Sequence, residues 1–242
     1  MNTERIALIT GANKGIGREV ARELAVLGYT VLIGSRSRAR GTDVAKEFTE
    51  EGLRAVFVPI DVTDHDTIKT ATNLIGEQFG KLDVLINNAG IALDGGSIPS
   101  QVSIETLRET FETNVFGAFA VLQTMLPLLR KSTAGRIVNI SSGLGSLTQN
   151  SDPSYEFAHV KSIAYNSSKA TLNAFTVQLA YELKDTAIKI NSADPGFTAT
   201  DLNDHHGTRT VEQAARIVVS LATLPESGPT GGFFDDYGLV PW

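Results

Sequence analysis

The sequence predicts an α/β protein built on one doubly wound, seven-stranded and mostly parallel sheet with helices on both faces. Short runs of Val, Ile and Leu alternate with helix-length amphipathic stretches from one end of the chain to the other. The runs are almost continuously apolar, as in parallel strands that helices cover on both sides. No linker, repeat or low-complexity tract divides them, so residues 1–242 are interpreted as a single domain.

The first elements show the alternation clearly. Arg5–Thr10 is predicted to be a buried strand, and a glycine turn leads from it into a helix over about Ile16–Leu27. Thr30–Ser35 is the second predicted strand. The amphipathic stretch Arg38–Glu51 is the second helix, and Gly52 ends it.

The middle of the chain repeats the pattern. Ala55–Ile60 is predicted as the third strand, and Thr63 or Asp64 is expected to cap the helix that follows and runs to Phe79. Leu82–Asn87 is the fourth strand, because its apolar run is short and bounded by polar residues.

The second half contains one long helix and the remaining strands. A helix is predicted over about Glu105–Leu129, followed by a strand at Arg136–Ser141 and a helix at about Ala164–Leu183. The last predicted elements are a strand at Lys189–Ala193, a helix at about Val211–Leu224 and a short seventh strand at Gly232–Asp235.

Composition narrows the classes of function. The 242 residues carry 21 Lys and Arg against 27 Asp and Glu, a formal net charge of −6, so a nucleic-acid partner is not expected. The absence of cysteine excludes disulfides, thiolate nucleophiles and Cys-ligated zinc. No apolar stretch is long enough for a membrane span or a signal peptide, which favours a cytoplasmic protein with no membrane contact.

The turn after the first strand carries the first functional motif. Residues 10–17 read TGANKGIG, in which the glycines permit a tight turn and let backbone N–H groups approach a pyrophosphate at a helix N-terminus. The alternative is a turn with no ligand. A Rossmann-type dinucleotide site is favoured because a strand precedes the glycines and a helix follows. Its candidate contacts are Gly11, Asn13, Lys14, Gly15, Ile16 and Gly17.

The end of the second strand indicates which dinucleotide binds. Folds that take NAD usually carry an acidic residue there, which binds the ribose 2′-OH. Residues 34–38 read GSRSR and hold no carboxylate. Arg36 and Lys14 are therefore predicted to pair with a 2′-phosphate, and the predicted cofactor is NADP(H). A basic cluster is often only a solvated face, and Arg38 and Arg40 are assigned to one.

Two further strand ends supply candidate cofactor contacts. Asp61 is predicted to accept a hydrogen bond from the adenine amino group, with Val62 beside it, although an N-cap is the alternative role for this acidic segment. The NNAG sequence that ends the fourth strand suits a loop that touches a ligand or cross-links strands. Its candidate contacts are Asn88, Ala89 and Gly90.

The candidate catalytic residues lie in the second half of the chain. Tyr165 and Lys169 are four residues apart, so they share one face of a helix. Ser142 directly follows the fifth strand, where a site at the edge of the sheet needs a hydroxyl. Ser142 does not lie in a G-x-S-x-G motif, and no set of histidine and acidic partners accompanies it, which argues against hydrolysis.

In this order the motifs resemble those of the short-chain dehydrogenase/reductases. The matching residues are 10–17, 87–90, Asn114, Ser142, Tyr165, Lys169 and Asp194-Pro195-Gly196. The resemblance covers nearly the whole chain. Within that family, the missing second-strand acid, Lys14 and the terminal Pro241-Trp242 resemble the NADPH-dependent carbonyl reductases.

The resemblance implies a role for each catalytic candidate. Tyr165 would donate a proton to a carbonyl oxygen as hydride arrives from the nicotinamide, and Ser142 would give that oxygen a second hydrogen bond. Lys169 would bind the nicotinamide ribose, and its ammonium, with the charge of the oxidised cofactor, would lower the pKa of the phenol. Asn114 would hold a water that relays protons to Lys169.

The loop after the sixth strand would also meet the cofactor. The resemblance places the backbone of Thr198 at the nicotinamide carboxamide and Thr200 near the pyrophosphate. The candidate contacts there are Pro195, Gly196, Thr198 and Thr200. The polar loop 201–208 is expected to close over the substrate. His205 and His206 are adjacent, so their side chains diverge, and no metal site is expected.

Two residue choices follow from the same resemblance. The catalytic hydroxyl is assigned to Ser142 rather than Ser141. Most relatives have about a dozen residues between this serine and the tyrosine, an interval that reaches Tyr155, but His159 follows Tyr155 where a lysine is needed. An insertion over Ser151–Ser162 explains why Tyr165 is the better candidate.

These expectations describe NADPH-dependent reduction of a small aldehyde or ketone, reversible as oxidation of an alcohol. Two alternatives stay open: an NAD-linked secondary alcohol dehydrogenase, and a non-catalytic NADP(H)-binding sensor, which would have no need of the Tyr–Lys pair. A homo-oligomer and a monomer both stay open, because the insertion precedes the helix through which relatives commonly pair.

Overall fold

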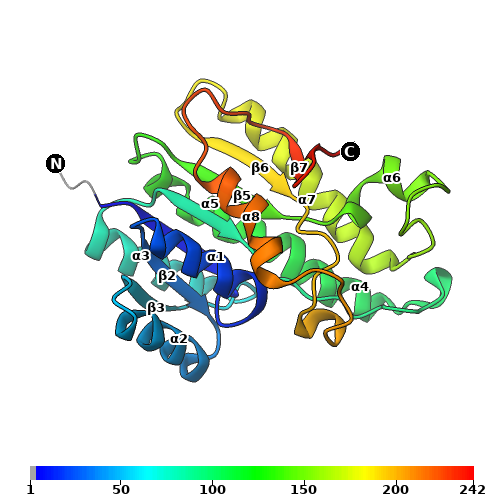
Figure 1. Ribbon diagram of the computed structural model, residues 1–242, viewed down its shortest axis with the longest axis horizontal. Helices are drawn as coiled ribbons and strands as arrows, with labels where there is room; N and C mark the ends of the chain where they lie inside the picture. The colour runs from blue at the N-terminus through cyan, green and yellow to red at the C-terminus, as the bar shows by residue number, and fades with distance from the viewer. Residues whose placement is uncertain (1–3) are drawn as a thin grey trace.

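A computed structural model describes residues 4–242, and within them eight strands form one sheet in the order β3-β2-β1-β4-β5-β6-β7-β8. The strands are β1 Ile6–Thr10, β2 Thr30–Ser35, β3 Ala55–Pro59, β4 Val84–Asn87, β5 Arg136–Ile140, β6 Lys189–Ala193, β7 Phe233–Asp235 and β8 Gly238–Leu239. All neighbours are parallel except β7 and β8, which pair antiparallel. The predicted fold class is confirmed (Figure 1).

The sheet has one strand more than the seven predicted, the short strand β8. The carboxylate of Asp235 accepts hydrogen bonds from the backbone N–H groups of Tyr237 and Gly238 at 2.8 and 2.9 Å, and this turns the chain back onto β7. Gly238 has a φ of 133°, a value that favours glycine. A strand of two exposed residues has no apolar run by which the sequence could indicate it.

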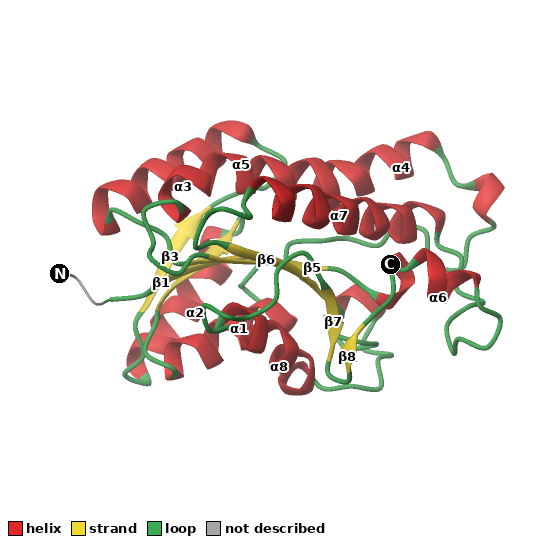
Figure 2. Cartoon of the chain, turned by 90° about the horizontal axis from the view of Figure 1, so that it is seen from above, coloured by secondary structure: helices red, strands yellow, loops and turns green. Residues whose placement is uncertain are grey.

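Helices cover both faces of the sheet (Figure 2). One face carries α1 Gly15–Val26, α2 Arg38–Glu50 and α8 Val211–Ala222. The other carries α3 His65–Phe79, α4 Ile104–Phe111, α5 Ala118–Leu129 and α7 Ile163–Glu182. Strand alternation divides the core accordingly: Ala7 and Ile9 of β1 pack toward the first set, and Ile6 and Leu8 toward the second.

The helix predicted over Glu105–Leu129 consists of three segments. Between α4 and α5 the chain forms a π-helical stretch, η2 Glu112–Gly117, which contains Asn114. Gly117 passes close to the loop after β3, because a Cβ there would lie 2.7 Å from the carbonyl oxygen of Val62. π-Helical turns inside α-helices are frequent at functional sites.

Short helical segments occupy the connections near the site. They are η1 Pro99–Gln101, η3 Gly143–Gly145, α6 Leu147–Ser151 and η4 Asp201–Asn203. The C-terminus lies against α6. The Ser146 hydroxyl donates to the carbonyl oxygen of Pro241 at 2.6 Å, and the Thr148 N–H donates to the carbonyl oxygen of Trp242 at 2.9 Å. The Trp242 ring stacks on Phe233 at 5.8 Å between centroids.

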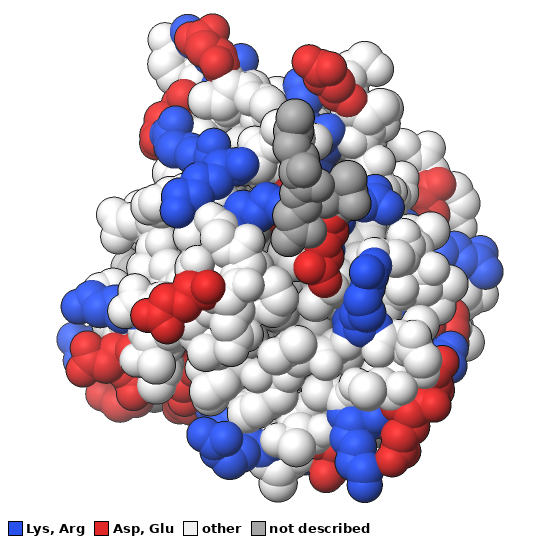
Figure 3. All heavy atoms as spheres, turned by 90° about the vertical axis from the view of Figure 1, so that its left-hand side faces the viewer, with Lys and Arg blue, Asp and Glu red and all other residues white. Residues whose placement is uncertain are grey.

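Basic and acidic side chains are interspersed on the face shown in Figure 3, as the small negative net charge leads one to expect. Among residues 4–242, no helix combines the length and the apolar character that crossing a membrane requires.

Candidate active site

The glycine turn joins β1 to α1 and leaves the start of that helix open. Gly11 and Gly15 have φ values of 65° and 57°, which glycine adopts without strain. Lys14 is the N-cap, and its side chain makes no capping hydrogen bond to the helix. The start of α1 therefore lacks a side-chain cap from its N-cap residue, as an anion-binding helix terminus requires.

Asn88 holds the glycine turn against the end of β4. Its side-chain Nδ2 donates to the carbonyl oxygens of Thr10 and Gly11 at 2.8 and 3.2 Å. A Cβ on Gly17 would clash with this amide, so only glycine at that position lets α1 lie this close to Asn88. The predicted segment after β4 is thus brought onto the predicted glycine turn, and the Asn88 side chain cross-links the two.

Other predicted contacts lie at the same edge of the sheet. The Ser35 hydroxyl at the end of β2 donates to Asn13 Oδ1 at 3.1 Å. Asp61 accepts hydrogen bonds from the Thr63 N–H and hydroxyl at 3.0 and 2.8 Å, while Asp64 caps α3. The capping alternative thus belongs to Asp64, and Asp61 forms a local turn with one carboxylate oxygen.

The two predicted phosphate-binding cations are arranged differently. Arg36 is exposed just beyond β2, and no ion pair joins it to another of the described residues. Lys14 instead pairs with Asp201, its Nζ 2.5 Å from Oδ2. His205 Nε2 lies 2.9 Å from the other oxygen of that carboxylate. The loop after β6 therefore already contacts the glycine turn.

That loop supplies the last group of predicted contacts. Gly196 has a φ of 71°, and the buried Thr198 hydroxyl donates back toward the carbonyl oxygens of Pro195 and Gly196 at 3.2 and 3.1 Å. Thr200 caps η4, and its methyl carbon lies 3.5 Å from where a Cβ on Gly15 would be. These contacts place the loop directly across the start of α1.

Asn114 joins the π-helical turn to two other parts of the site. Its Nδ2 donates to the carbonyl oxygen of Ile91 at 2.8 Å and to the Ser168 hydroxyl at 3.0 Å, and its Oδ1 accepts from the Ile91 N–H at 2.8 Å. The buried amide thereby fixes the segment after β4 against α7. A Cβ on Gly90 would lie 3.4 Å from Asn114 Oδ1 and 3.6 Å from Lys169 Nζ, so these groups are neighbours.

Asp94 orients the start of α7, a role that the sequence analysis missed. Its buried carboxylate accepts hydrogen bonds from the N–H groups of Ala164 and Tyr165 at 2.6 and 3.3 Å. A negative charge at a helix N-terminus is stabilised by the uncapped N–H groups and the helix dipole. An Asp in the loop sequence LDGG indicates only a turn, so nothing local shows that it caps a helix far along the chain.

Tyr165, Lys169 and Ser142 meet at the carboxyl end of β5. Lys169 is buried, and its Nζ donates to the carbonyl oxygen of Ile140 at 2.7 Å while lying 5.6 Å from the centroid of the Tyr165 ring. The side chains of Tyr165 and Ser142 share a hydrogen bond. The loop after β5 approaches α7 closely, because a Cβ on Gly145 would lie 2.7 Å from that of Lys169.

The protein's own groups favour the neutral forms of this pair. Burial raises the pKa of Tyr165 to about 12, with a further contribution from the negative charge of Asp194, and the hydrogen bond with Ser142 opposes the rise. Burial lowers the pKa of Lys169 to about 8. In the polypeptide by itself, desolvation disfavours both charges. The expectation that Lys169, together with the charge of the oxidised cofactor, lowers the pKa of the phenol stays a prediction.

Tyr155 and His159 do not form a second pair of this kind. They lie in a series of turns between α6 and α7 rather than on one helix face, and His159 is exposed. The Tyr155 ring packs edge-on against Phe157 at 5.8 Å, and Phe157 packs on Phe197 at 5.7 Å. The segment Ser151–Ser162 therefore contacts the loop after β6 through aromatic rings.

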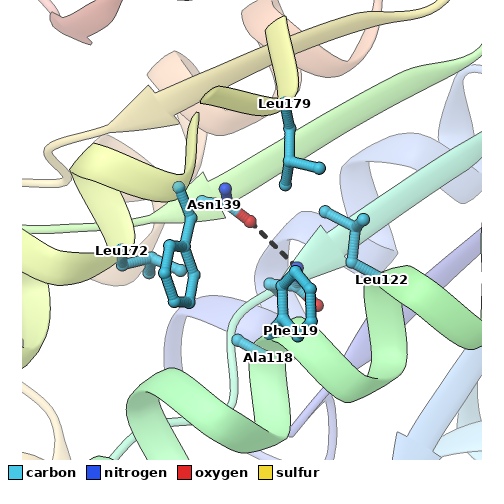
Figure 4. Close-up of a pocket in the computed structure, with 8 residues that line it drawn as sticks. Ala118, Phe119, Leu122, Asn139, Leu172 and Leu179 are labelled. Carbon is cyan, nitrogen blue, oxygen red and sulfur yellow. Dashed lines mark hydrogen bonds between the residues drawn. The ribbon is translucent and has the colours of Figure 1, made fainter. Parts of the chain in front are cut away.

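Two other features of the structure have no chemistry of their own. Within residues 4–242, no three His, Asp or Glu side chains gather as a metal-binding group. A hollow between α5 and α7 is lined by apolar side chains and by the hydrogen-bonded pair Asn87 and Asn139 (Figure 4). It is too small to admit a water molecule, so it is a feature of core packing.

The fold and the site together define a class of protein. A doubly wound sheet, a glycine turn that opens an uncapped helix N-terminus, and a Tyr–Lys helix beside a strand-end serine are the parts of a dinucleotide-dependent oxidoreductase that acts on CH–OH or C=O groups.

Comparison with known proteins gives the family. The model described as short chain dehydrogenase matches residues 5–210, and the chain belongs to this family. It is 37% identical to short-chain dehydrogenase anuI of Penicillium roqueforti, covering 91% of this chain and 89% of that one. It is 32% identical to (−)-isopiperitenone reductase of Mentha piperita, covering 96% of each. The NADPH-bound carbonyl reductase from chicken fatty liver superposes with a TM-score of 0.86 at 28% identity, covering 99% of each chain.

Proposed function

We propose that this protein reduces an aldehyde or ketone to an alcohol with NADPH, and that Tyr165 gives the proton. The observation that carries the proposal is the meeting of Tyr165, Lys169 and Ser142 at the carboxyl end of β5. The similar reductases from mint and chicken, one of them named as NADPH-bound, support the direction of the reaction and the choice of cofactor.

The residues at the edge of the sheet fit an NADP(H) molecule. The uncapped start of α1 would take the pyrophosphate, and Arg36 would take the 2′-phosphate, because no carboxylate at the end of β2 repels it. Asp61 keeps one carboxylate oxygen free of the local turn, which suits the adenine amino group. When bound, this cofactor supplies the hydride that the carbonyl carbon needs.

The chain's own groups would then manage the proton. With a pKa above its ordinary 10.0, Tyr165 is protonated at neutral pH, so its hydroxyl can donate to the substrate oxygen. Ser142 would donate a second hydrogen bond and stabilise the negative charge that develops there. After Tyr165 has donated its proton, Lys169, with a pKa of about 8, would return a proton to the phenolate. Asn114, which lies beside Lys169, would hold the water that relays protons to the amine.

A panel of aldehydes, cyclic ketones and ketoesters, followed by loss of NADPH absorbance, tests the proposed function. Tyr165→Phe is expected to lower kcat by about 10²–10⁴-fold, the usual range for a positioned acid, with NADPH affinity nearly unchanged. Tyr155→Phe is the matched control, since it removes the other phenol near the site and should retain turnover. Full activity in Tyr165→Phe together with loss in Tyr155→Phe would reverse the assignment.

The same assays separate the alternatives. Faster turnover with NADH than with NADPH would favour the NAD-linked alcohol dehydrogenase. Binding of NADPH with no turnover on any member of the panel would favour the sensor.

A further inference from the structure

Arg209 is outside the catalytic and cofactor residues named above, yet its main chain closes the loop after β6. Its N–H donates to the carbonyl oxygen of Phe197 at 3.0 Å, and its own carbonyl oxygen accepts the N–H of Ala199 at 2.9 Å. These two bonds form a parallel bridge between Thr198 and Arg209. The bridge fixes the base of the loop formed by residues 199–208.

The bridge also decides where the main chain of Thr198 points. Phe197 and Ala199 turn their bonded groups toward Arg209, so the N–H and C=O of Thr198 point to the opposite side. There the carbonyl oxygen of Thr198 accepts from Asn203 Nδ2 at 2.9 Å. The Thr198 N–H has no acceptor among residues 4–242, so it is available to a ligand. It belongs to the residue whose backbone is predicted to meet the nicotinamide carboxamide.

The side chain of Arg209 holds the same loop from behind. Its Cδ lies 2.7 Å from where a Cβ on Gly196 would be, so the arginine stem packs directly on that glycine. The guanidinium donates to the carbonyl oxygen of Gln213 in α8 at 2.9 Å and pairs with Asp236 in the turn between β7 and β8. One side chain thus fastens the loop after β6 to α8 and to the last turn of the sheet.

The ion pair between Arg209 and Asp236 is partly enclosed. The two side chains are 22% and 26% exposed, about half as much as those of Lys14 and Asp201. An enclosed ion pair is screened less by solvent and salt than an open one. Arg209 is therefore the better placed of the two cations to hold the loop in one position.

We propose, on the basis of the function proposed above, that Arg209 is a positioning residue for the nicotinamide half of NADPH: it holds Gly196 and Thr198 so that the Thr198 N–H meets the carboxamide. The adenosine half is expected at Arg36 and Asp61, at the ends of β2 and β3. In the sheet these strands are separated from β6 by β1, β4 and β5. Loss of the guanidinium should therefore weaken binding of the whole cofactor and leave binding of its adenosine end unchanged.

The test uses Arg209→Met, which keeps an unbranched apolar stem against Gly196 and removes the guanidinium. Fluorescence titration measures the dissociation constant of NADPH, and calorimetry measures that of adenosine 2′,5′-bisphosphate, which has no nicotinamide half. NADPH is expected to bind about tenfold more weakly, the usual effect of losing a charge-assisted contact. The dissociation constant of the bisphosphate should stay as in wild type. Arg209→Lys keeps a cation for Asp236 and should recover most of the lost affinity.

Arg130→Met is the matched control, because it breaks an exposed ion pair with Glu182 far along α5 and should leave both dissociation constants unchanged. If Arg209→Met does not fold, Asp236→Asn removes the same ion pair from its other side and should weaken NADPH binding alone.

Equal weakening of both nucleotides, or of neither, would overturn the positioning role. Binding needs no turnover, so the comparison tests Arg209 even if no carbonyl compound is reduced. A wild-type protein that binds neither nucleotide would overturn the proposed function and this inference together.

Discussion

At the scale of single residues, Asp94 is a buried side chain that holds the start of the helix carrying Tyr165 and Lys169. The carboxylate binds the first N–H groups of α7, one of which belongs to Tyr165 itself. The direction in which α7 leaves its cap therefore decides where the phenol points, and one full turn later where Lys169 lies. The same buried side chain also fastens the loop after β4 to the site.

Asp94→Ala is expected to lower both stability and activity. Loss of a helix cap usually costs about 0.5–2 kcal/mol, and a buried charge-assisted one belongs at the upper end. Thermal denaturation should show a fall of about 4–8 °C, with a lowered kcat at saturating substrate. Asp64→Ala removes the exposed cap of α3 and is the control: it should lower the melting temperature without lowering kcat. Equal effects of both variants on kcat would contradict the orienting role of Asp94.

Arg36 carries the predicted choice of cofactor. It is exposed at the end of β2, and none of the ion pairs among the described residues engages it, so it is free to meet a phosphate. Arg36→Asp should raise the KM for NADPH tenfold or more, about 1.4 kcal/mol per decade, and improve the relative use of NADH. Arg40→Asp makes the same charge change on the neighbouring solvated face and should leave the NADPH to NADH ratio of kcat/KM as it was. A ratio that Arg36→Asp does not move would argue against the phosphate contact.

The residues proposed for catalysis could be picked out from the sequence, whereas a residue that orients them could not. Tyr165 and Lys169 stand out in the sequence by their spacing on one helix face, and Ser142 by its place just after β5. Asp94 acts through the backbone N–H groups of Ala164 and Tyr165, which only the folded chain brings near. A one-dimensional pattern holds no signal for such partners.

At the scale of elements, the strands and most helices follow the sequence prediction closely, and the long helix does not. Apolar periodicity runs without interruption through Glu105–Leu129, yet the structure inserts a π-helical turn at Glu112–Gly117. The cause is tertiary: Gly117 packs on the backbone of Val62, and Asn114 binds Ile91 and Ser168. The extra residue in the turn aims Asn114 at the site, which hydrophobic periodicity cannot foresee.

The loop after β6 is an element whose contact with the glycine turn has a measurable consequence. Lys14 pairs with Asp201, and both side chains are about half exposed, at 52% and 51%. If Lys14 binds a cofactor phosphate as predicted, the Asp201 carboxylate would compete with that phosphate for the amine and would repel it. Asp201→Asn should therefore tighten NADPH binding, by about two- to fivefold because solvent-exposed pairs are weak.

Fluorescence titration of NADPH measures the gain in affinity of Asp201→Asn over wild type, and this gain should shrink as salt is added. Asp204→Asn is the control, because it removes a charge from the same loop and asparagine tolerates the positive φ of 50° found there. Weaker NADPH binding in Asp201→Asn would mean that the pair instead holds the loop in the binding conformation.

At the scale of the whole molecule, the sheet gathers segments from every part of the chain at one edge. The loops after β1 to β6 all begin there, and two cores on opposite faces of the sheet hold the strands in register. Burying an amine and a phenol at this edge has a thermodynamic consequence for the entire fold. The free energy of unfolding must depend on pH through Lys169 and Tyr165.

The direction follows from the two pKa shifts. The pKa of Lys169 is about 8 in the folded protein and 10.5 in the unfolded chain, so between these values the unfolded state binds more protons and stability rises with pH. The pKa of Tyr165 is about 12 folded and 10.0 unfolded, so above pH 10 the folded state binds more protons and stability falls again. Lys169 alone should therefore add roughly 2 kcal/mol between about pH 8 and pH 10.

Urea unfolding of the protein without cofactor at several pH values across this range measures the effect, and Lys169→Met isolates it. The variant should be the more stable protein at pH 7, where wild type must either bury a charge or lose a proton, and the gap should narrow toward pH 10. Lys69→Met replaces an exposed lysine of α3 and should leave the pH dependence as in wild type. If the difference in free energy of unfolding between wild type and Lys169→Met stays the same from pH 7 to pH 10, the amine is solvated rather than buried. A proton relay through a Lys169 ammonium with a lowered pKa is then no longer supported.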